Sequence, residues 1–153
     1  MWQIKKILVP TDGSDMAKLA LDAGIDIAKQ NGAEIVALFV VDIPHQLLAH
    51  RLEEKIKSDL GEPAVNAVIS ATEKEGLKAK GLIEQGHAAD IILKIADQEN
   101  IDLIVMGTRG ASKMKKLLLG LGSIASAVVA HAHCSVLAVR ETGRGQESAR
   151  RKS

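Results

Sequence analysis

The 153-residue sequence contains few aromatic residues, few prolines and almost no cysteine. Phe, Trp and Tyr together make up only 1% of residues, so the core must be packed with Ile, Leu, Val and Ala. The single cysteine, Cys134, excludes an intramolecular disulfide and favours a reducing compartment. The net charge of +1 gives no indication of a nucleic-acid partner or another polyanion.

Long apolar runs are also absent. No segment approaches the roughly 18 apolar residues that a membrane span requires. The N-terminal segment has no apolar stretch long enough for a signal peptide before Pro10 interrupts it. We therefore expect a cytoplasmic protein that does not associate with membranes.

The C-terminal end differs in composition from the rest of the chain. Residues 141–153 carry four cations and two anions, a net charge of +2, and contain no large apolar residue. Such a composition is typical of a disordered segment. We predict one domain over residues 1–141 and a basic, disordered tail over 142–153, with a role as an interaction arm left open.

Five short apolar segments alternate with longer segments of helical period. Four of the five are almost continuously apolar, as in parallel strands that are covered on both faces, and the segment from Leu77 to Gly86 alternates more and is expected near a sheet edge. The predicted strands are Lys6–Thr11, Glu34–Asp42, Leu77–Gly86, Asp102–Gly107 and Ser135–Arg140. This alternation predicts a single α/β domain with a parallel sheet.

The connections between these strands show helical spacing. In the first, Ser14 can cap a helix that ends before Gly32. The connection from Ile43 to Gly76 is longer and has two helical parts, with a break or kink near Gly61 and Pro63. Its first part is rich in charge and is expected to lean away from the core. The last helix is expected from about Ser123 to Ala130. The predicted apolar stripes are Ala17, Ala20, Ala23, Gly24, Ile27 and Ala28 in the first helix, and Ala88, Ile91, Ile92, Ile95 and Ala96 in the third.

Candidate ligand-binding residues follow the predicted strands, because parallel sheets bind ligands at their carboxyl ends. The fourth strand runs into a segment with four glycines and four basic residues, and the last helix begins after Gly122. Glycines allow backbone amides to approach an anion, and a helix N-terminus adds partial positive charge. Both a phosphate site and a purely steric role for the glycines remain open.

Known motifs narrow the chemistry. The chain lacks the Gly, four residues, Gly-Lys-Ser/Thr pattern of a P-loop. Gly120 to Ala125 fits the G-x-G-x-x-A dinucleotide fingerprint, but too little chain follows it to supply the remaining strands of that fold. His131, His133 and Cys134 are too few donors for a convincing metal site and are more typical of a helix C-terminus. No nucleophilic triad is visible by spacing.

Five ordered blocks together resemble the universal stress protein family. They are "KKILVPTDGS" from Lys5, "VVD" from Val40, "DLIVMGTRG" from Asp102, Gly122-Ser123 before the last helix, and "CSVLAVR" from Cys134. The resemblance covers nearly all of residues 5–140. It implies an open, five-stranded parallel sheet of order 3-2-1-4-5 with helices on both faces, like that of the adenine nucleotide alpha hydrolases. It also implies a homodimer formed through the last strand, Ser135 to Arg140.

The ATP-binding branch of the family carries Gly-x-x-Gly, nine residues, then Gly-Ser or Gly-Thr. Gly107 and Gly110 match the first half. Nine residues after Gly110 stands Gly120, followed by Leu121, whereas the Gly-Ser pair comes after eleven residues. The loop is therefore two residues longer than the family pattern.

The resemblance implies that this site binds ATP or another adenine nucleotide, with any Mg²⁺ held mainly by the phosphates. Asp12 and the backbone of Val40 would meet the adenine end, and Pro10 and Met106 would line the pocket wall. Asp12 has an alternative role in capping the first helix with Ser14, and Asp42 is interpreted as a turn residue. The full set of predicted nucleotide-binding residues is Pro10, Thr11, Asp12, Val40, Met106, Gly107, Thr108, Arg109, Gly110, Gly120, Gly122 and Ser123.

The function implied is a nucleotide-dependent switch in the stress response, or at most a slow ATPase, working with an unknown protein partner. No catalytic residue or metal ligand is assigned. The alternative is a dimeric interaction module of the same fold that does not bind nucleotide, which the longer loop motivates.

Overall fold

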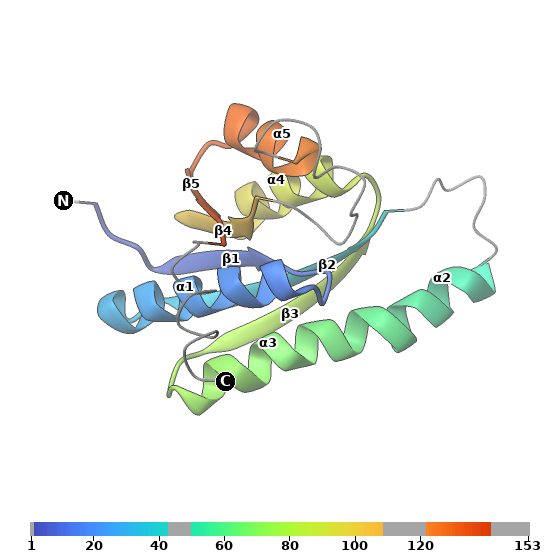
Figure 1. Ribbon diagram of the computed structural model, residues 1–153, viewed down its shortest axis with the longest axis horizontal. Coiled ribbons are helices and arrows are strands. Elements are labelled where there is room, and N and C mark those ends of the chain that lie inside the picture. The colour runs from blue at the N-terminus through green and yellow to red at the C-terminus, as the bar shows by residue number, and fades with distance from the viewer. Residues whose placement is uncertain (1, 43–49, 109–121, 142–153) are drawn as a thin grey trace.

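The computed structural model describes residues 2–42, 50–108 and 122–141, and its central feature is a five-stranded parallel sheet (Figure 1). The strands are β1 (Lys6–Pro10), β2 (Glu34–Val41), β3 (Ala79–Gln85), β4 (Leu103–Gly107) and β5 (Ser135–Val139). Their order is β3-β2-β1-β4-β5, and every neighbouring pair is parallel. The predicted fold class and strand order are confirmed, and the strand bounds differ from the prediction by at most two residues at either end.

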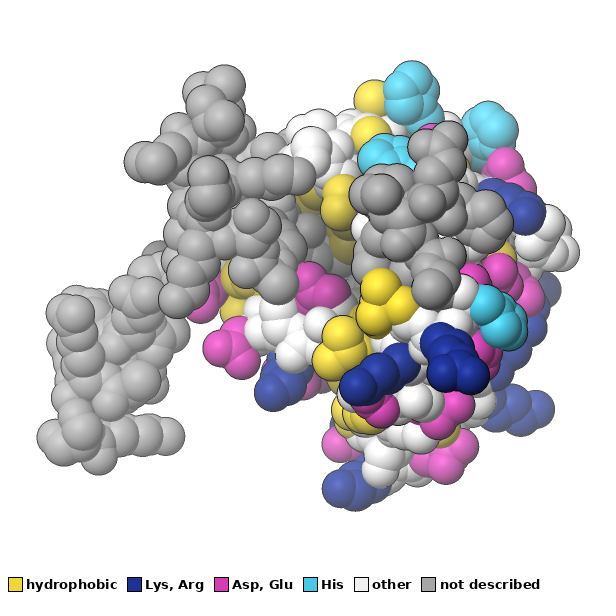
Figure 2. Space-filling model, turned by 90° about the vertical axis from the view of Figure 1, so that its right-hand side faces the viewer, with side chains coloured by type: hydrophobic (Ala, Val, Ile, Leu, Met, Phe, Trp, Pro, Cys, Tyr) yellow, Lys and Arg dark blue, Asp and Glu magenta, His cyan; other side chains and the backbone are white. Residues whose placement is uncertain are grey.

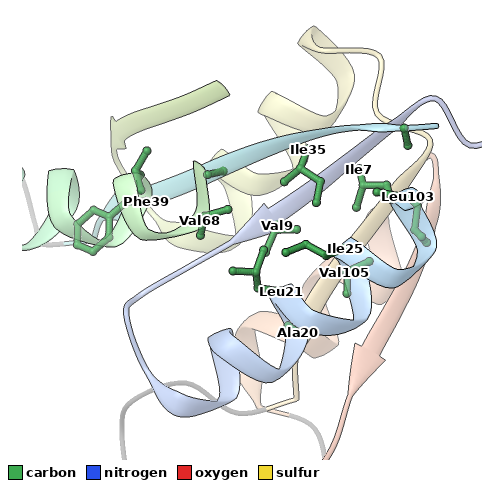
Figure 3. Packing of buried hydrophobic residues seen from close by; sticks show 14 of the residues in the cluster. Ile7, Val9, Ala20, Leu21, Ile25, Ile35, Phe39, Val68, Leu103 and Val105 are labelled. Carbon is green, nitrogen blue, oxygen red and sulfur yellow. The ribbon is translucent and has the colours of Figure 1, made fainter. Parts of the chain in front are cut away.

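Helices cover both faces of the sheet (Figure 1). Helices α1 (Asp15–Asn31) and α3 (Glu62–Lys74) pack on one face, where Ile7, Val9 and Val105 belong to the buried core shown in Figure 3. Helices α4 (Ala88–Gln98) and α5 (Ser123–His131) pack on the other face, over a core that includes Leu8 and Ile104. Adjacent residues of β1 and β4 therefore enter opposite cores, as the alternation of side chains along a strand requires.

Helix α1 begins and ends where the capping residues predict. The Ser14 hydroxyl accepts a hydrogen bond from the Ala17 amide at 3.2 Å, and Gly32 adopts a left-handed conformation with φ 66° at the C-terminus.

The apolar stripe predicted for α1 was partly wrong. Leu21 and Ile25 are buried, whereas two predicted members, Ala23 and Ile27, are only partly buried. Positions 17, 20, 21, 24, 25 and 28 follow the three-and-four spacing of a single helix face more closely than the predicted set.

The long connection is not broken at Gly61 and Pro63: helical backbone continues from His50 to Lys74, and a π-helical turn stands where a break or kink was predicted (Figure 1). Helix α2 (His50–Ile56) has no buried residue, in agreement with the prediction that the first part leans away from the core. A π-helical turn (Lys57–Gly61) joins it to α3, and Pro63 lies in the first turn of α3. Gly61 is buried at this junction, where an added Cβ would lie 3.1 Å from the Phe39 ring. Close contact with β2 explains why the smallest residue stands there.

The two edge strands of the sheet, β3 and β5, differ in how far they are buried. Strand β3 is half-buried, as its alternating pattern predicted. Strand β5 was predicted to be covered on both faces, and within one chain this prediction is wrong: Ser135 and Leu137 are exposed, and the rest of the strand is only half-buried. The reason is that β5 is an edge strand that pairs with β4 alone.

Some predictions fall outside the described residues. These are the disordered tail at 142–153 and, among the predicted binding residues, Arg109, Gly110 and Gly120. The domain boundary at residue 141 stays a prediction. Among the helices that are described, none is long and apolar enough to cross a bilayer.

Candidate functional site

A cleft of about 280 Å³ lies at the carboxyl ends of β1, β2 and β4. The ends of these strands and the first turns of α1, α4 and α5 supply its walls, where ligands of open parallel sheets usually bind. Figure 2 looks onto this edge of the sheet, and its described side chains carry charges of both signs. The lining residues are Pro10, Thr11, Asp12, Ser14, Ala17, Leu38, Val40, Asp42, Ala88, Ile92, Met106, Gly107, Thr108, Gly122, Ser123, Ile124 and Ala125.

Nine of the twelve predicted binding residues line this cleft, and the other three lie outside the described residues. One part of the wall is apolar, since Leu38 and Met106 are buried and Val40 packs against them. A flat apolar ring can be held against such a surface with loss of its hydrating water.

Asp12 lies in the turn before α1 and also lines the cleft. Its carboxylate accepts a hydrogen bond from the Ser14 amide at 2.9 Å, so it helps to form the turn that precedes α1. It also lines the cleft and is exposed there. The capping alternative is therefore present in the structure, and contact with a ligand stays a prediction.

Two backbone amides near the glycines are already used by the fold. The Thr108 amide donates to the Val139 carbonyl at 3.0 Å, and the Gly122 amide donates to the Thr108 carbonyl at 2.6 Å. The second bond ties the end of β4 to the start of α5. It brings the two halves of the predicted phosphate site together, but it also occupies one amide that was expected to hold a phosphate.

The first turn of α5 offers other amides at this end of the cleft. The first bond within the helix runs from the Ser126 amide to the Gly122 carbonyl at 2.9 Å. The amides of Ile124 and Ala125 precede that bond, and both residues line the cleft. A helix N-terminus carries partial positive charge, so this end of the cleft suits an anion.

Sequence reasoning missed the role of Asp42. Its carboxylate accepts a hydrogen bond from the Ala88 amide at 3.0 Å, across 46 residues, and lies 3.7 Å from Nδ1 of His87. Asp42 was interpreted as a turn residue, yet it caps α4 and lines the cleft. The sequence feature that could have indicated this role is the position of Asp42 directly after β2, an inner strand of the sheet. The sequence analysis also did not assign Leu38 and Ile92 to the cleft wall. Their place there depends on how α4 packs on β2, which the sequence does not show.

The family model for the universal stress protein family matches residues 3–140. The chain belongs to this family. A universal stress protein of Methanocaldococcus jannaschii is 37% identical over 143 residues, which cover 90% of this chain and 82% of that protein. The solved structure of the universal stress protein UspA of Lactobacillus plantarum is 30% identical, with a TM-score of 0.77, and the match covers 90% of this chain and 99% of that one.

More distant family structures share the fold and contain nucleotides. The universal stress protein of Archaeoglobus fulgidus in complex with dAMP is 19% identical, with a TM-score of 0.68 over 92% of this chain and 100% of that one. A universal stress protein in complex with cAMP is 22% identical, with a TM-score of 0.64 over 91% of this chain and 99% of that one. At these identities the likeness shows the fold alone.

The histidines and the cysteine near the end of α5 do not gather into one cluster. His133 Nδ1 lies 3.2 Å from a carboxylate oxygen of Asp97, and burial raises the pKa of the Cys134 thiol. A raised pKa leaves less of the reactive thiolate at neutral pH. Across the described residues, no three His, Cys, Asp or Glu side chains form a group that could hold a metal ion.

Proposed function

We propose that this universal stress protein binds an adenine nucleotide, ATP in particular, in the cleft at the carboxyl ends of β1, β2 and β4. In this role it acts in the stress response as a nucleotide-dependent switch or a slow ATPase. The observation that carries the proposal is that one cleft collects nine predicted binding residues from three strands and the start of α5.

The chemistry of the cleft matches the parts of a nucleotide. The apolar wall at Leu38, Val40 and Met106 suits the adenine ring. In this proposal Asp12, which lines the cleft, meets the polar edge of the base or the ribose, and the first turn of α5 binds the phosphates. In this proposal any Mg²⁺ is held mainly by the phosphates of the nucleotide.

The family likeness supports adenine rather than another base. Two proteins of the same fold were solved with dAMP and with cAMP, and both ligands carry the adenine ring and a phosphate. The identity of those proteins to this chain is low, so support for the residue roles comes from the lining of the cleft.

Removal of the Ser123 hydroxyl tests the phosphate end. Because hydrogen bonds to charged groups contribute roughly 1.5–3 kcal/mol, we expect Ser123→Ala to weaken ATP binding at least about tenfold in isothermal titration calorimetry. Ser126→Ala, on the next turn of α5 and exposed, is the matched control and should bind as the wild type does. Absence of binding by the folded wild-type protein at millimolar ATP would refute the proposal.

A second candidate function is a dimeric interaction module that does not bind nucleotide. The hydrogen bond from the Gly122 amide to the Thr108 carbonyl favours it, because that amide is not available to a phosphate in this conformation. This candidate predicts that the purified protein releases no nucleotide on denaturation, as checked by mass spectrometry. Release of AMP, ADP or ATP would count against it.

We further propose that two copies associate through β5. The strand is an edge that leaves Leu137 exposed, and an exposed apolar edge invites pairing with another strand.

A further inference from the structure

Helix α4 receives its N-terminal cap from a strand rather than from its own residues. The N-cap residue, His87, makes no side-chain capping bond. Instead the Asp42 carboxylate, at the end of β2, accepts from the Ala88 amide at 3.0 Å. A carboxylate at this position satisfies an otherwise unpaired amide and complements the positive end of the helix dipole.

A second bond fixes the same turn to β2. The Gly86 amide donates to the Val41 carbonyl at 3.1 Å, and Gly86 adopts φ 150°, a conformation that side-chain-bearing residues rarely take. An added Cβ there would lie 2.8 Å from Ile91. The turn between β3 and α4 is thus held to β2 by a backbone bond and by the Asp42 side chain.

The residues positioned by this cap form one wall of the cleft. Ala88 and Ile92 both line it, and Ile92 belongs to the same buried cluster as Leu38 and Met106. Val40, which the proposed function places against the base, lies on β2, two residues before Asp42. The Asp42 cap therefore sets the position of the first turn of α4 relative to the wall that faces the base.

We propose that Asp42 is a positioning residue for the base end of the nucleotide cleft, and that its cap on α4 determines selectivity for adenine over guanine. The inference rests on the proposed function. Guanine carries an amino group at C2, where adenine has only a hydrogen atom, and a carbonyl oxygen at C6 in place of adenine's amino group. A wall held close to the ring therefore rejects guanine more strongly than a wall that moves. Loss of the cap loosens Ala88 and Ile92 and leaves the phosphate end at α5 unchanged.

The test compares adenosine, AMP and GMP as ligands of the full-length protein by isothermal titration calorimetry. For Asp42→Ala we expect a three- to tenfold weaker affinity for AMP and a clear fall in the AMP-to-GMP preference. The gain in affinity from adenosine to AMP should equal that of the wild type, because the phosphate end is intact. Asp42→Asn keeps an oxygen that can accept from Ala88 and should restore most of the selectivity.

The matched control is Asp102→Ala. Asp102 also accepts from backbone amides through one carboxylate oxygen, those of Lys5 at 2.8 Å and Lys6 at 3.0 Å, but it lies outside the cleft lining. We expect this variant to lose stability without any change in the AMP-to-GMP ratio. If Asp42→Ala does not fold, Asp42→Ser takes its place in the test. The serine oxygen is one bond closer to the backbone than the carboxylate oxygens of Asp42, so it cannot occupy their position beside the Ala88 amide.

The outcomes separate the two proposals. A wild-type protein that binds no adenine nucleotide overturns the proposed function and this inference together. A wild-type protein that binds AMP and GMP equally, or an Asp42→Ala variant that keeps the wild-type selectivity, overturns this inference alone. An Asp42→Ala variant that loses the gain from adenosine to AMP also overturns it, because Asp42 would then act at the phosphate end.

Discussion

At the scale of single residues, Gly81 on β3 has the least room for a side chain among the described glycines. A Cβ added there would lie 2.0 Å from Cγ1 of Val65 and 3.0 Å from Cδ1 of Ile69, both on α3. No real side chain tolerates the first distance, so α3 rests directly on the backbone of β3. Glycine is normally unfavourable within a strand, and this contact is the reason for its presence.

We predict that Gly81→Ala lowers the free energy of unfolding by about 1–3 kcal/mol, the usual cost of overpacking. The cause is displacement of Val65, which is buried at 5% exposure. Urea denaturation followed by circular dichroism measures the change.

The control for this prediction is a double-mutant cycle with Val65→Ala. In that background the clashing methyl group is gone, and Gly81→Ala should become neutral or stabilising because alanine is favoured over glycine in a strand. An equal loss in both backgrounds would show that the clash with Val65 is not the cause.

At the scale of elements, Glu99 joins three parts of the fold. It follows the end of α4, and its carboxylate lies 2.6 Å from the ammonium of Lys80 on β3 and 3.7 Å from that of Lys6 on β1. The hydrogen bond from Lys80, reinforced by the charges of Lys80 and Lys6, holds the pKa of Glu99 below its usual value.

This lowered pKa predicts a pH dependence of stability. The charged Glu99 stabilises the folded state above its unfolded pKa of roughly 4.3, and this contribution is lost as pH falls through the lower folded pKa. Wild type should therefore lose more unfolding free energy between pH 7 and acid pH than Glu99→Gln, by at most about 1 kcal/mol. Urea titrations at both pH values measure it, with Glu73→Gln on the exposed side of α3 as the control. An equal acid loss in wild type and Glu99→Gln would contradict the prediction.

The elements themselves followed from local signals. Ser14 and Gly32 marked the ends of α1 because capping depends on neighbours in the chain. Gly61 and Pro63 marked the right place for an irregularity, but the structure has a π-helical turn within continuous helix there and not a break. The buried face of α1 was partly missed, since burial of Leu21 and Ile25 depends on how the helix is rotated on the sheet.

At the scale of the whole molecule, the proposed dimer depends on β5. Leu137 is 38% exposed on this edge strand. If two copies pair there, Leu137→Lys should place a charge in the interface and shift the protein from dimer to monomer in light scattering coupled to size exclusion. Leu19→Lys is a matched control, because Leu19 has almost the same exposure, 37%, but lies on α1. A wild-type monomer, or a Leu137→Lys protein that stays dimeric at the same concentration, would refute the β5 interface.

The candidate site was predictable to the extent that it lies at strand ends. Pro10, Thr11, Val40 and Met106 could be placed in one cleft because parallel strands bring their carboxyl ends to one edge. Ala88 and Ile92 were predicted as core residues of a helix, and their second role at the cleft was not foreseen. That role depends on where α4 starts relative to β2.

The sequence alone determined the alternation of strands and helices, the helix caps, the strand order through the family resemblance, and most of the residues around the cleft. These features depend on periodicity, on capping chemistry and on ordered motifs, and each of these is a property of residues that lie close together in the chain. Only the tertiary structure decided which amides the fold already uses, and that Asp42 reaches the Ala88 amide 46 residues away. Contacts between residues so far apart in the chain depend on how the helices pack on the sheet, and no local sequence pattern predicts that packing.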